Sequence, residues 1–212
     1  MVRGKQNGVQ VRRLAERGVY DRATIDAILA DSYLGHVAFI DDGRPVVIPM
    51  VVWRVGDYVH FHAANKGRVA TVCADARVCI SIAHLDGMVL ARSAFNHSMN
   101  YRSLVIHGLC EVVHDAAERL AALEALTEHI CAGRWPLLRP VRPNELAATV
   151  LLRVPLDQTA AKVRTGMPGD EADDPDWPVW TGVWPLHTSF GEPLADPTMP
   201  AGIEAGAPVK VS

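Results

Sequence analysis

The sequence lacks the features that mark membrane proteins and nucleic-acid-binding proteins. Its 212 residues contain no apolar run near the roughly 20 residues that span a bilayer, and its first residues lack the apolar core of a secretory signal. Acidic residues number 24 and basic residues 21, which gives a formal charge of -3. This balance provides no general attraction to nucleic acid or to an anionic membrane. We therefore expect a globular chain with neither of these partners.

Cysteine is scarce as well. The four cysteines are Cys73, Cys79, Cys110 and Cys131, and no pair has the Cys-x-x-Cys spacing of many zinc sites. Each lies within an apolar pattern, which favours reduced, buried thiols over a disulfide scaffold. Together with the missing signal, this predicts a cytoplasmic protein with no metal in its site.

The sequence contains neither the Gly-x-Ser-x-Gly turn of many serine hydrolases nor a Walker A or dinucleotide fingerprint. One local pattern suits a phosphate. Lys66, Gly67 and Arg68 follow a strand and begin a helix, where free backbone N–H groups and two cations converge. Two solvated cations beside a helix start are the commoner explanation of such a pattern.

Short strand patterns, by contrast, are abundant. They alternate between apolar and polar residues and are separated by turn residues. Strands are predicted at 36–40, 45–53, 58–63, 77–84, 88–94, 103–113, 149–154 and 159–165. A helix is predicted at 22–32 after Asp21 as its N-cap, a second at 66–75, and a third from Asp115 to Ile130 with Asp115 and Glu118 as a capping-box-like start. A Pro-rich connection covers 136–143.

Because strands dominate and are joined mainly by hairpins, the chain is predicted to be mainly β, an antiparallel barrel with peripheral helices. Within 45–53 both alternating sets are apolar, which indicates a strand covered on both faces, in a closed barrel or at a subunit interface. We expect an N-terminal arm at 1–19, one domain at 20–188 and a loosely ordered tail at 189–212.

The segment Leu85–Ser103 is rich in hydroxyl, amide, imidazole and guanidinium groups, so it is either a site or a polar hairpin loop. Arg92 and Arg102 share strand faces with apolar residues. Each therefore lies in water at a strand end, pairs with a carboxylate or meets a bound anion. His97 is the local candidate for proton transfer.

A pair of histidines and a segment rich in tryptophan each have two possible roles. His60 and His62 project to one side of a strand with Tyr58, as two metal ligands would, but a half-exposed structural pair is the commoner explanation. The tryptophans of Gly169–Trp184 either cap the edge of a core or stack on a ligand.

The order of these motifs resembles the pyridoxamine 5'-phosphate oxidase-like FMN-binding split-barrel superfamily, in the flavin-nucleotide-binding branch related to nitroimidazole-resistance proteins. The motifs that carry the resemblance extend over most of the chain. They are Tyr20–Asp21, His36–Ile40, Val46–Pro49, His60–His62, Lys66–Arg68, Leu85–Ser93, Ser98–Ser103, Ala161–Arg164 and Trp180–Pro185.

The resemblance implies a six-stranded split barrel with extra helices, and a homodimer with FMN at its interface. It places Pro49, Met50 and Val51 along the flavin ring. It also places His62, Lys66 and Arg68 near the ribityl phosphate, and Asn100, Tyr101, Arg102 and Ser103 on a neighbouring strand of the cofactor site. Two positions depart from the family. Gly67 and Val69 flank Arg68 where relatives often carry a hydroxyl and a second cation, and Asn96 stands where relatives tend to have histidine.

The resemblance implies an FMN-dependent oxidoreductase that acts on a small planar substrate, with His97 as proton donor and the tryptophan segment as a lid. One alternative is a non-catalytic flavin- or haem-binding module, for which His60, His62, His84, His97 and His107 are the available axial ligands. Another is a reductase that uses F420. Pyridoxamine phosphate oxidation itself is not expected, because the chain lacks the Arg-rich ending associated with it.

Overall fold

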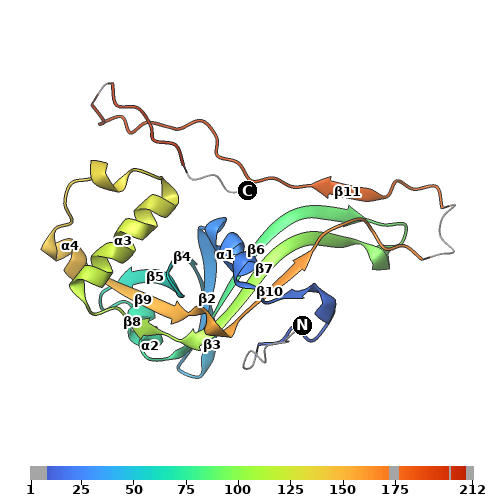
Figure 1. The fold of residues 1–212 in the computed structure, drawn as a ribbon, viewed down its shortest axis with the longest axis horizontal. Coiled ribbons are helices and arrows are strands. Elements are labelled where there is room, and N and C mark those ends of the chain that lie inside the picture. Colours follow the sequence, from blue (N-terminus) through green and yellow to red (C-terminus); the bar gives the residue numbers. More distant parts are fainter. Residues whose placement is uncertain (1–8, 172–176, 201, 209–212) are drawn as a thin grey trace.

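The chain forms two antiparallel sheets flanked by helices (Figure 1). The computed structural model describes residues 9–171, 177–200 and 202–208. The larger sheet has the order β1-β10-β7-β6-β2-β3, with β11 pairing with β6, and the smaller has the order β4-β5-β9-β8. The larger sheet contains β1 (Gly18–Val19), β2 (Leu34–Asp41), β3 (Arg44–Val51), β6 (Arg77–Leu90), β7 (Ser98–Leu109), β10 (Thr159–Arg164) and β11 (Gly182–Pro185). The smaller contains β4 (Trp53–Val55), β5 (Tyr58–Ala64), β8 (Glu111–Val112) and β9 (Thr149–Pro155).

The described residues form four α-helices around the sheets: α1 (Arg22–Ala30), α2 (Arg68–Cys73), α3 (Ala116–Ile130) and α4 (Pro143–Ala148). The predicted caps of the two longer helices are confirmed. The carboxylate of Asp21 accepts from the N–H of Thr24 at 2.9 Å, and that of Asp115 accepts from the N–H of Glu118 at 2.8 Å. In the described residues, no helix is long and apolar enough to cross a membrane.

The main core lies between α1 and the inner faces of the sheets, and residues such as Val37, Phe61, Ile80 and Leu104 are fully enclosed. The two sheets are in close contact at Gly108 of β7, where an added Cβ would lie 2.6 Å from Cγ1 of Val154. A second, smaller cluster around Trp53 packs under α3. The prediction of a mainly antiparallel β fold is therefore confirmed.

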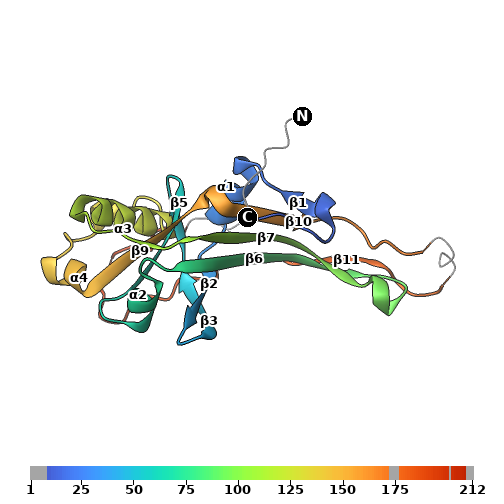
Figure 2. The ribbon, with the colours of Figure 1, turned by 90° about the horizontal axis from the view of Figure 1, so that it is seen from below.

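β6 and β7 form one long hairpin, which corrects the predicted strand boundaries (Figure 2). β6 continues from Arg77 to Leu90 where two strands were expected, and β7 begins at Ser98 rather than at residue 103. The cause is a β-bulge at Asp86, which interrupts the alternation of buried and exposed residues in the sequence. Before the bulge the even-numbered residues are buried, as at Ile82, and after it the odd-numbered ones, as at Val89.

Two further elements were not predicted. The Pro-rich connection contains α4, which has a proline in its first turn, and the tryptophan segment contains β11, which pairs with the distal part of β6. All four cysteines are free, as predicted, but only Cys73 and Cys110 are buried, whereas Cys79 and Cys131 are partly exposed. Burial raises the pKa of Cys73 to about 11, so this thiol stays protonated at neutral pH.

The chain after β11 contains no helix or strand among its described residues and returns past β6 toward α3 (Figure 1). The ring of Phe190 contacts that of Tyr33, with 6.0 Å between their centroids. The thiol of Cys131 donates to the carbonyl of Ala207 at 3.3 Å. Residues 201 and 209–212 of the predicted tail, and residues 1–8 of the predicted arm, lie outside the described residues.

Candidate functional site

The first group of predicted binding residues lies on β3, at the margin of the larger sheet. Among the described strands β3 pairs only with β2, so its outer edge presents unpaired peptide groups. Pro49 and Val51 are exposed, whereas Met50 points to the opposite face and packs against the core. An apolar ligand placed on Pro49 and Val51 would reach free backbone donors and acceptors at the strand edge.

The second group surrounds the start of α2. Lys66 has a left-handed backbone with φ of 66°, and Gly67 lies so close to the preceding turn that an added Cβ would be 2.8 Å from the carbonyl oxygen of Ala64. Arg68 donates through Nε to Asp41 at 2.5 Å, and its two Nη groups have no partner among the described residues. The side chain of Arg68 is 56% exposed, which leaves it accessible to an anion.

His62 of the same group is exposed on β5, with its ring centroid 6.1 Å from that of Trp53. His60, two residues earlier, is buried and stacks on Trp53 at 5.9 Å. Burial, and secondarily the charge of Arg153, lower the pKa of His60 to about 4, so its ring is neutral at pH 7. The described residues contain no cluster of three or more metal-ligating side chains.

The third group, Asn100–Ser103 on β7, forms hydrogen bonds within the chain. The amide of Asn100 donates to the carbonyl of Gly166 at 3.1 Å and accepts from Arg164. The hydroxyl of Ser103 donates to the carbonyl of Lys162 at 3.1 Å. These bonds join β7 to β10 and the loop after it, so Asn100 and Ser103 have a structural role whatever else they bind.

Arg102 in the same group pairs with two carboxylates. Its guanidinium donates to Asp31 at 2.5 Å and to Asp86 at 3.0 Å. Arg92 likewise pairs with Asp170 at 2.7 Å. The sequence left three alternatives for each arginine: water, a carboxylate or a bound anion. In the structure both arginines pair with carboxylates. Tyr101 is half-buried, opposite Leu85 and Arg164 in the ladder.

One chain does not bring these groups together. The strand order places β2 and β6 between β3 and β7, which corresponds to roughly 14 Å across the sheet. Arg68 contacts Asp41 at the end of β2, whereas Val51 pairs with Leu34 at its beginning. A site that used all three groups would have to reach across this distance or draw on more than one chain.

His97 lies apart from all of them. It precedes β7 at the tip of the long hairpin, about 17 Å along the strand from Arg102. Its Nδ1 donates to the carbonyl of Ser93 at 2.7 Å, and its side chain is exposed. The neighbouring Phe95 is 93% exposed.

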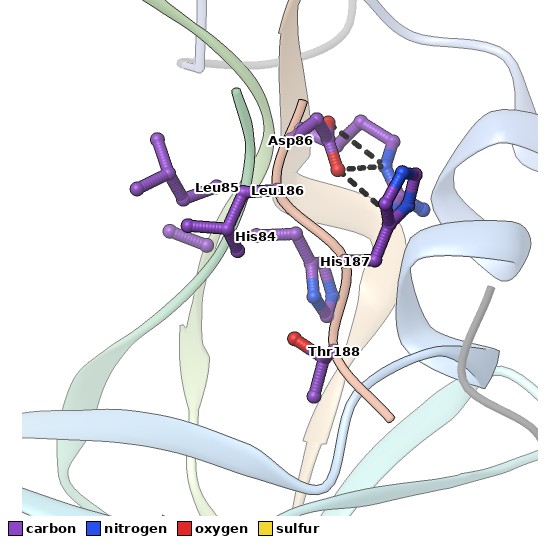
Figure 3. A pocket seen from close by; sticks show the side chains of 8 residues that line it. His84, Leu85, Asp86, Leu186, His187 and Thr188 are labelled. Carbon is purple, nitrogen blue, oxygen red and sulfur yellow. Dashed lines mark hydrogen bonds and ion pairs between the residues drawn. The ribbon is translucent and has the colours of Figure 1, made fainter. Parts of the chain in front are cut away.

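A pocket of about 570 Å³ lies between β6 and the chain after β11 (Figure 3). Its walls include His84, Leu85 and Asp86 of β6, Arg102 of β7, and Leu186, His187 and Thr188. Sequence reasoning missed the last three, because nothing in their local pattern indicates that this segment folds back over β6. The one available signal was Arg102, whose need for a partner on an apolar face pointed to nearby acids.

The imidazole of His84 is held in one tautomer by its neighbours. The hydroxyl of Ser32 donates to the carbonyl of Ile28 at 2.5 Å, so it has no proton left to donate to His84. Nε2 of His84 lies 2.8 Å from that hydroxyl oxygen and therefore donates to it. In a neutral ring with this tautomer, Nδ1 of His84 carries the lone pair and can accept a hydrogen bond.

Comparisons with known proteins agree with this architecture. A family model described as pyridoxamine 5'-phosphate oxidase matches residues 21–163. The flavocytochrome Anf3 from Azotobacter vinelandii is 34% identical, with a TM-score of 0.88, and the match covers 92% of this chain and 91% of that one. The FAD and heme binding protein from Mycobacterium smegmatis is 36% identical, with a TM-score of 0.84, and the match covers 88% of this chain and 92% of that one.

A more distant structure shares the fold alone. It is named as a 5-nitroimidazole antibiotic resistance protein from Bacteroides thetaiotaomicron, and is 22% identical with a TM-score of 0.59. That match covers 69% of this chain and 86% of that one. A search of curated proteins found no match.

Proposed function

Because this chain belongs to the pyridoxamine 5'-phosphate oxidase family, we propose that it binds a flavin nucleotide and acts as a flavin-dependent oxidoreductase. The observation that carries the proposal is the match, over about nine tenths of both chains, to two proteins named for a flavocytochrome and for FAD and haem. A cytoplasmic location is part of the same proposal.

The residues of the first two groups are suited to such a cofactor. Pro49 and Val51 offer apolar surface beside a free strand edge, which can bond the polar edge of a flavin ring. Lys66 and Arg68 are exposed cations that can pair with its phosphate. The resemblance favours FMN, while one relative is named for FAD, and both nucleotides carry the ring and a phosphate that these residues would contact.

The proposal includes a homodimer, and one face of the larger sheet supports it. The recorded strand pairs place exposed apolar side chains of five strands on that face, opposite the core. They are Leu34, Ile40, Val47, Val51, Leu85, Met88, Met99, Leu109 and Trp184. An apolar surface of this extent is typical of a subunit interface. A second copy would also supply the Asn100–Ser103 group that lies far from β3 in one chain.

A bound flavin would supply hydride or electron transfer to a small planar substrate. The chain would contribute the rest. Val47 and Val51, covered by a second copy, would exclude water from the ring, and Arg68 would fix the phosphate. His97 is proposed as the proton donor, through the imidazole that its hydrogen bond to Ser93 orients.

Haem is the second candidate cofactor, because two relatives that match most of the chain are named as a flavocytochrome and as an FAD and heme binding protein. Among the histidines considered from the sequence, His62, His97 and His107 are exposed, and His84 lines the pocket. His60 is enclosed by Trp53 and Tyr58, so an iron ligand at this position would require the core under α3 to open.

The proposal is tested by the absorption spectrum of the purified protein before and after addition of FMN, FAD or haem. We expect flavin bands, released flavin that chromatography identifies, and anaerobic bleaching by a nicotinamide nucleotide faster than with free flavin. A protein that binds no flavin at micromolar concentration would contradict the proposal. Flavin that binds but is reduced no faster than free flavin would contradict the oxidoreductase and leave a binding module.

A further inference from the structure

The edge of β6 that faces β2 and β11 is interrupted. β2 pairs with this edge as far as Ser81, and β11 pairs with it from Gly87 onward. Between them no strand in the described part of the chain pairs with this edge. Within the described residues, one further backbone bond crosses the gap, from the N–H of Leu186 to the carbonyl of Asp86 at 3.0 Å. The other peptide groups on this edge have no strand partner among those residues.

The pocket lies at this gap. Ala83 lines the pocket on the β6 side. His84 and Leu85 lie on the same side, and the segment from Leu186 to Thr188, which continues the chain beyond the paired residues of β11, lies on the other (Figure 3). Two extended backbones that face each other leave a slot. A flat molecule with N–H donors and C=O acceptors in its plane suits such a slot, because it can bond the free edge as an added strand would.

The side chains that line the pocket restrict the class of ligand further. Nδ1 of His84 carries a lone pair, because Nε2 donates to Ser32, so His84 can accept a hydrogen bond from a ligand N–H. Arg102 already meets the carboxylates of Asp31 and Asp86. The two carboxylates outweigh its single positive charge, which disfavours an anionic ligand.

We propose that this pocket binds an uncharged, planar cyclic amide of the pyrimidinedione type, with a ring N–H donating to Nδ1 of His84. The proposal goes beyond flavin binding, because the pocket lies two strands away from β3, where the flavin ring is expected. The same chemistry occurs in free pyrimidinediones and in the pyrimidine ring of a flavin, so the test separates these two sources.

The test compares three probes of similar shape, uracil, 1,3-dimethyluracil and orotate, by protein-detected NMR on the FMN-loaded protein. Dimethyluracil lacks both N–H donors, and orotate adds a carboxylate. We expect uracil to bind with a dissociation constant in the millimolar range or below, dimethyluracil to bind about tenfold more weakly, and orotate to show no binding. The ¹⁵N resonance of Nδ1 of His84 should shift with uracil alone.

Binding to both the FMN-loaded and the flavin-free protein indicates a free ligand, and binding only to the flavin-free protein indicates that a flavin ring occupies the pocket. His84→Ala should weaken uracil about tenfold, whereas His114→Ala, which changes an exposed histidine outside the pocket, should not. Flavin content, measured on each sample, separates a failure here from a failure of flavin binding. If uracil does not bind either form, or binds as well as dimethyluracil, the proposal is wrong. The probe comparison needs no variant, so it holds even if His84→Ala does not fold.

Discussion

Replacement of His60 by leucine should remove a large part of the acid sensitivity of the fold. His60 is 4% exposed, stacks on Trp53, and has an Nδ1 without a hydrogen-bond partner among the described residues. Burial, followed by the charge of Arg153, lowers its pKa to about 4, below the value of 6.5 expected in the unfolded chain. Between these values the unfolded chain binds a proton that the folded chain does not, so stability falls as the pH falls through this window.

The size of the effect follows from the shift. Each pH unit within the window costs about 1.4 kcal/mol, so wild type should lose roughly 2 kcal/mol of unfolding free energy between about pH 7 and about pH 5 on account of His60 alone. In His60→Leu this loss disappears, and only the contribution of other groups remains. At neutral pH the variant should lie within about 1 kcal/mol of wild type, because leucine has a similar volume and needs no hydrogen-bond partner.

Urea unfolding followed by tryptophan fluorescence at a series of pH values measures the unfolding free energy at neutral pH and its loss at lower pH. His62→Leu is the matched control, since it removes an exposed histidine from the same strand. It should keep the wild-type dependence on pH. The reasoning is refuted if His60→Leu loses as much stability as wild type between about pH 7 and about pH 5.

Three other predictions concern the cofactor, the dimer and the fold. Arg68→Ala should weaken FMN about tenfold and leave riboflavin unchanged in fluorescence titrations, because only FMN carries the phosphate; an equal loss for both would remove Arg68 from the phosphate site. Val47→Glu should convert a dimer to a monomer in sedimentation, whereas Leu137→Glu, at an exposed position of a different surface, should not; an unchanged dimer would place the interface elsewhere. Gly108→Ala should lower the unfolding free energy by about 2 kcal/mol, because its Cβ would lie 2.6 Å from Val154. Gly191→Ala, with nothing within 4 Å, should change the unfolding free energy little. If a denaturant titration gives similar unfolding free energies for the two variants, the close contact of the two sheets is contradicted.

Much of the fold could be predicted from local patterns. Asp21 and Asp115 identified the two longer helices, and alternating residues identified most strands. The order of the motifs identified the split-barrel family, which the family model confirms. The prediction was wrong at residues 85–103, where a bulge and an exposed apolar face made a continuous hairpin look like two strands and a polar loop.

The site was less accessible to sequence reasoning. The prediction that Arg92 and Arg102 need partners was correct, because each pairs with a carboxylate. The partners Asp170 and Asp31 are distant in sequence, and no local pattern identifies them. His187 and Thr188 reach the pocket only because β11 pairs with β6, a long-range contact that periodicity does not encode. The binding roles of Pro49, Lys66 and their neighbours stay predictions.

The extra residue at Asp86 has a consequence for how the hairpin can vary. Because it reverses which residues face inward, the distal strand presents Met88 outward and Val89 inward, in continuity with the proximal half. Loss of Asp86 would leave Met88 outward and Val89 inward, because Gly87 would then follow Leu85 in the ordinary alternation of a strand. Loss of a residue elsewhere in β6 has no such compensation and would turn one part of the strand over. Loss of Asp86 would still remove one of the two carboxylates that meet Arg102. The hairpin should therefore tolerate a change of one in its residue count better at Asp86 than elsewhere along β6.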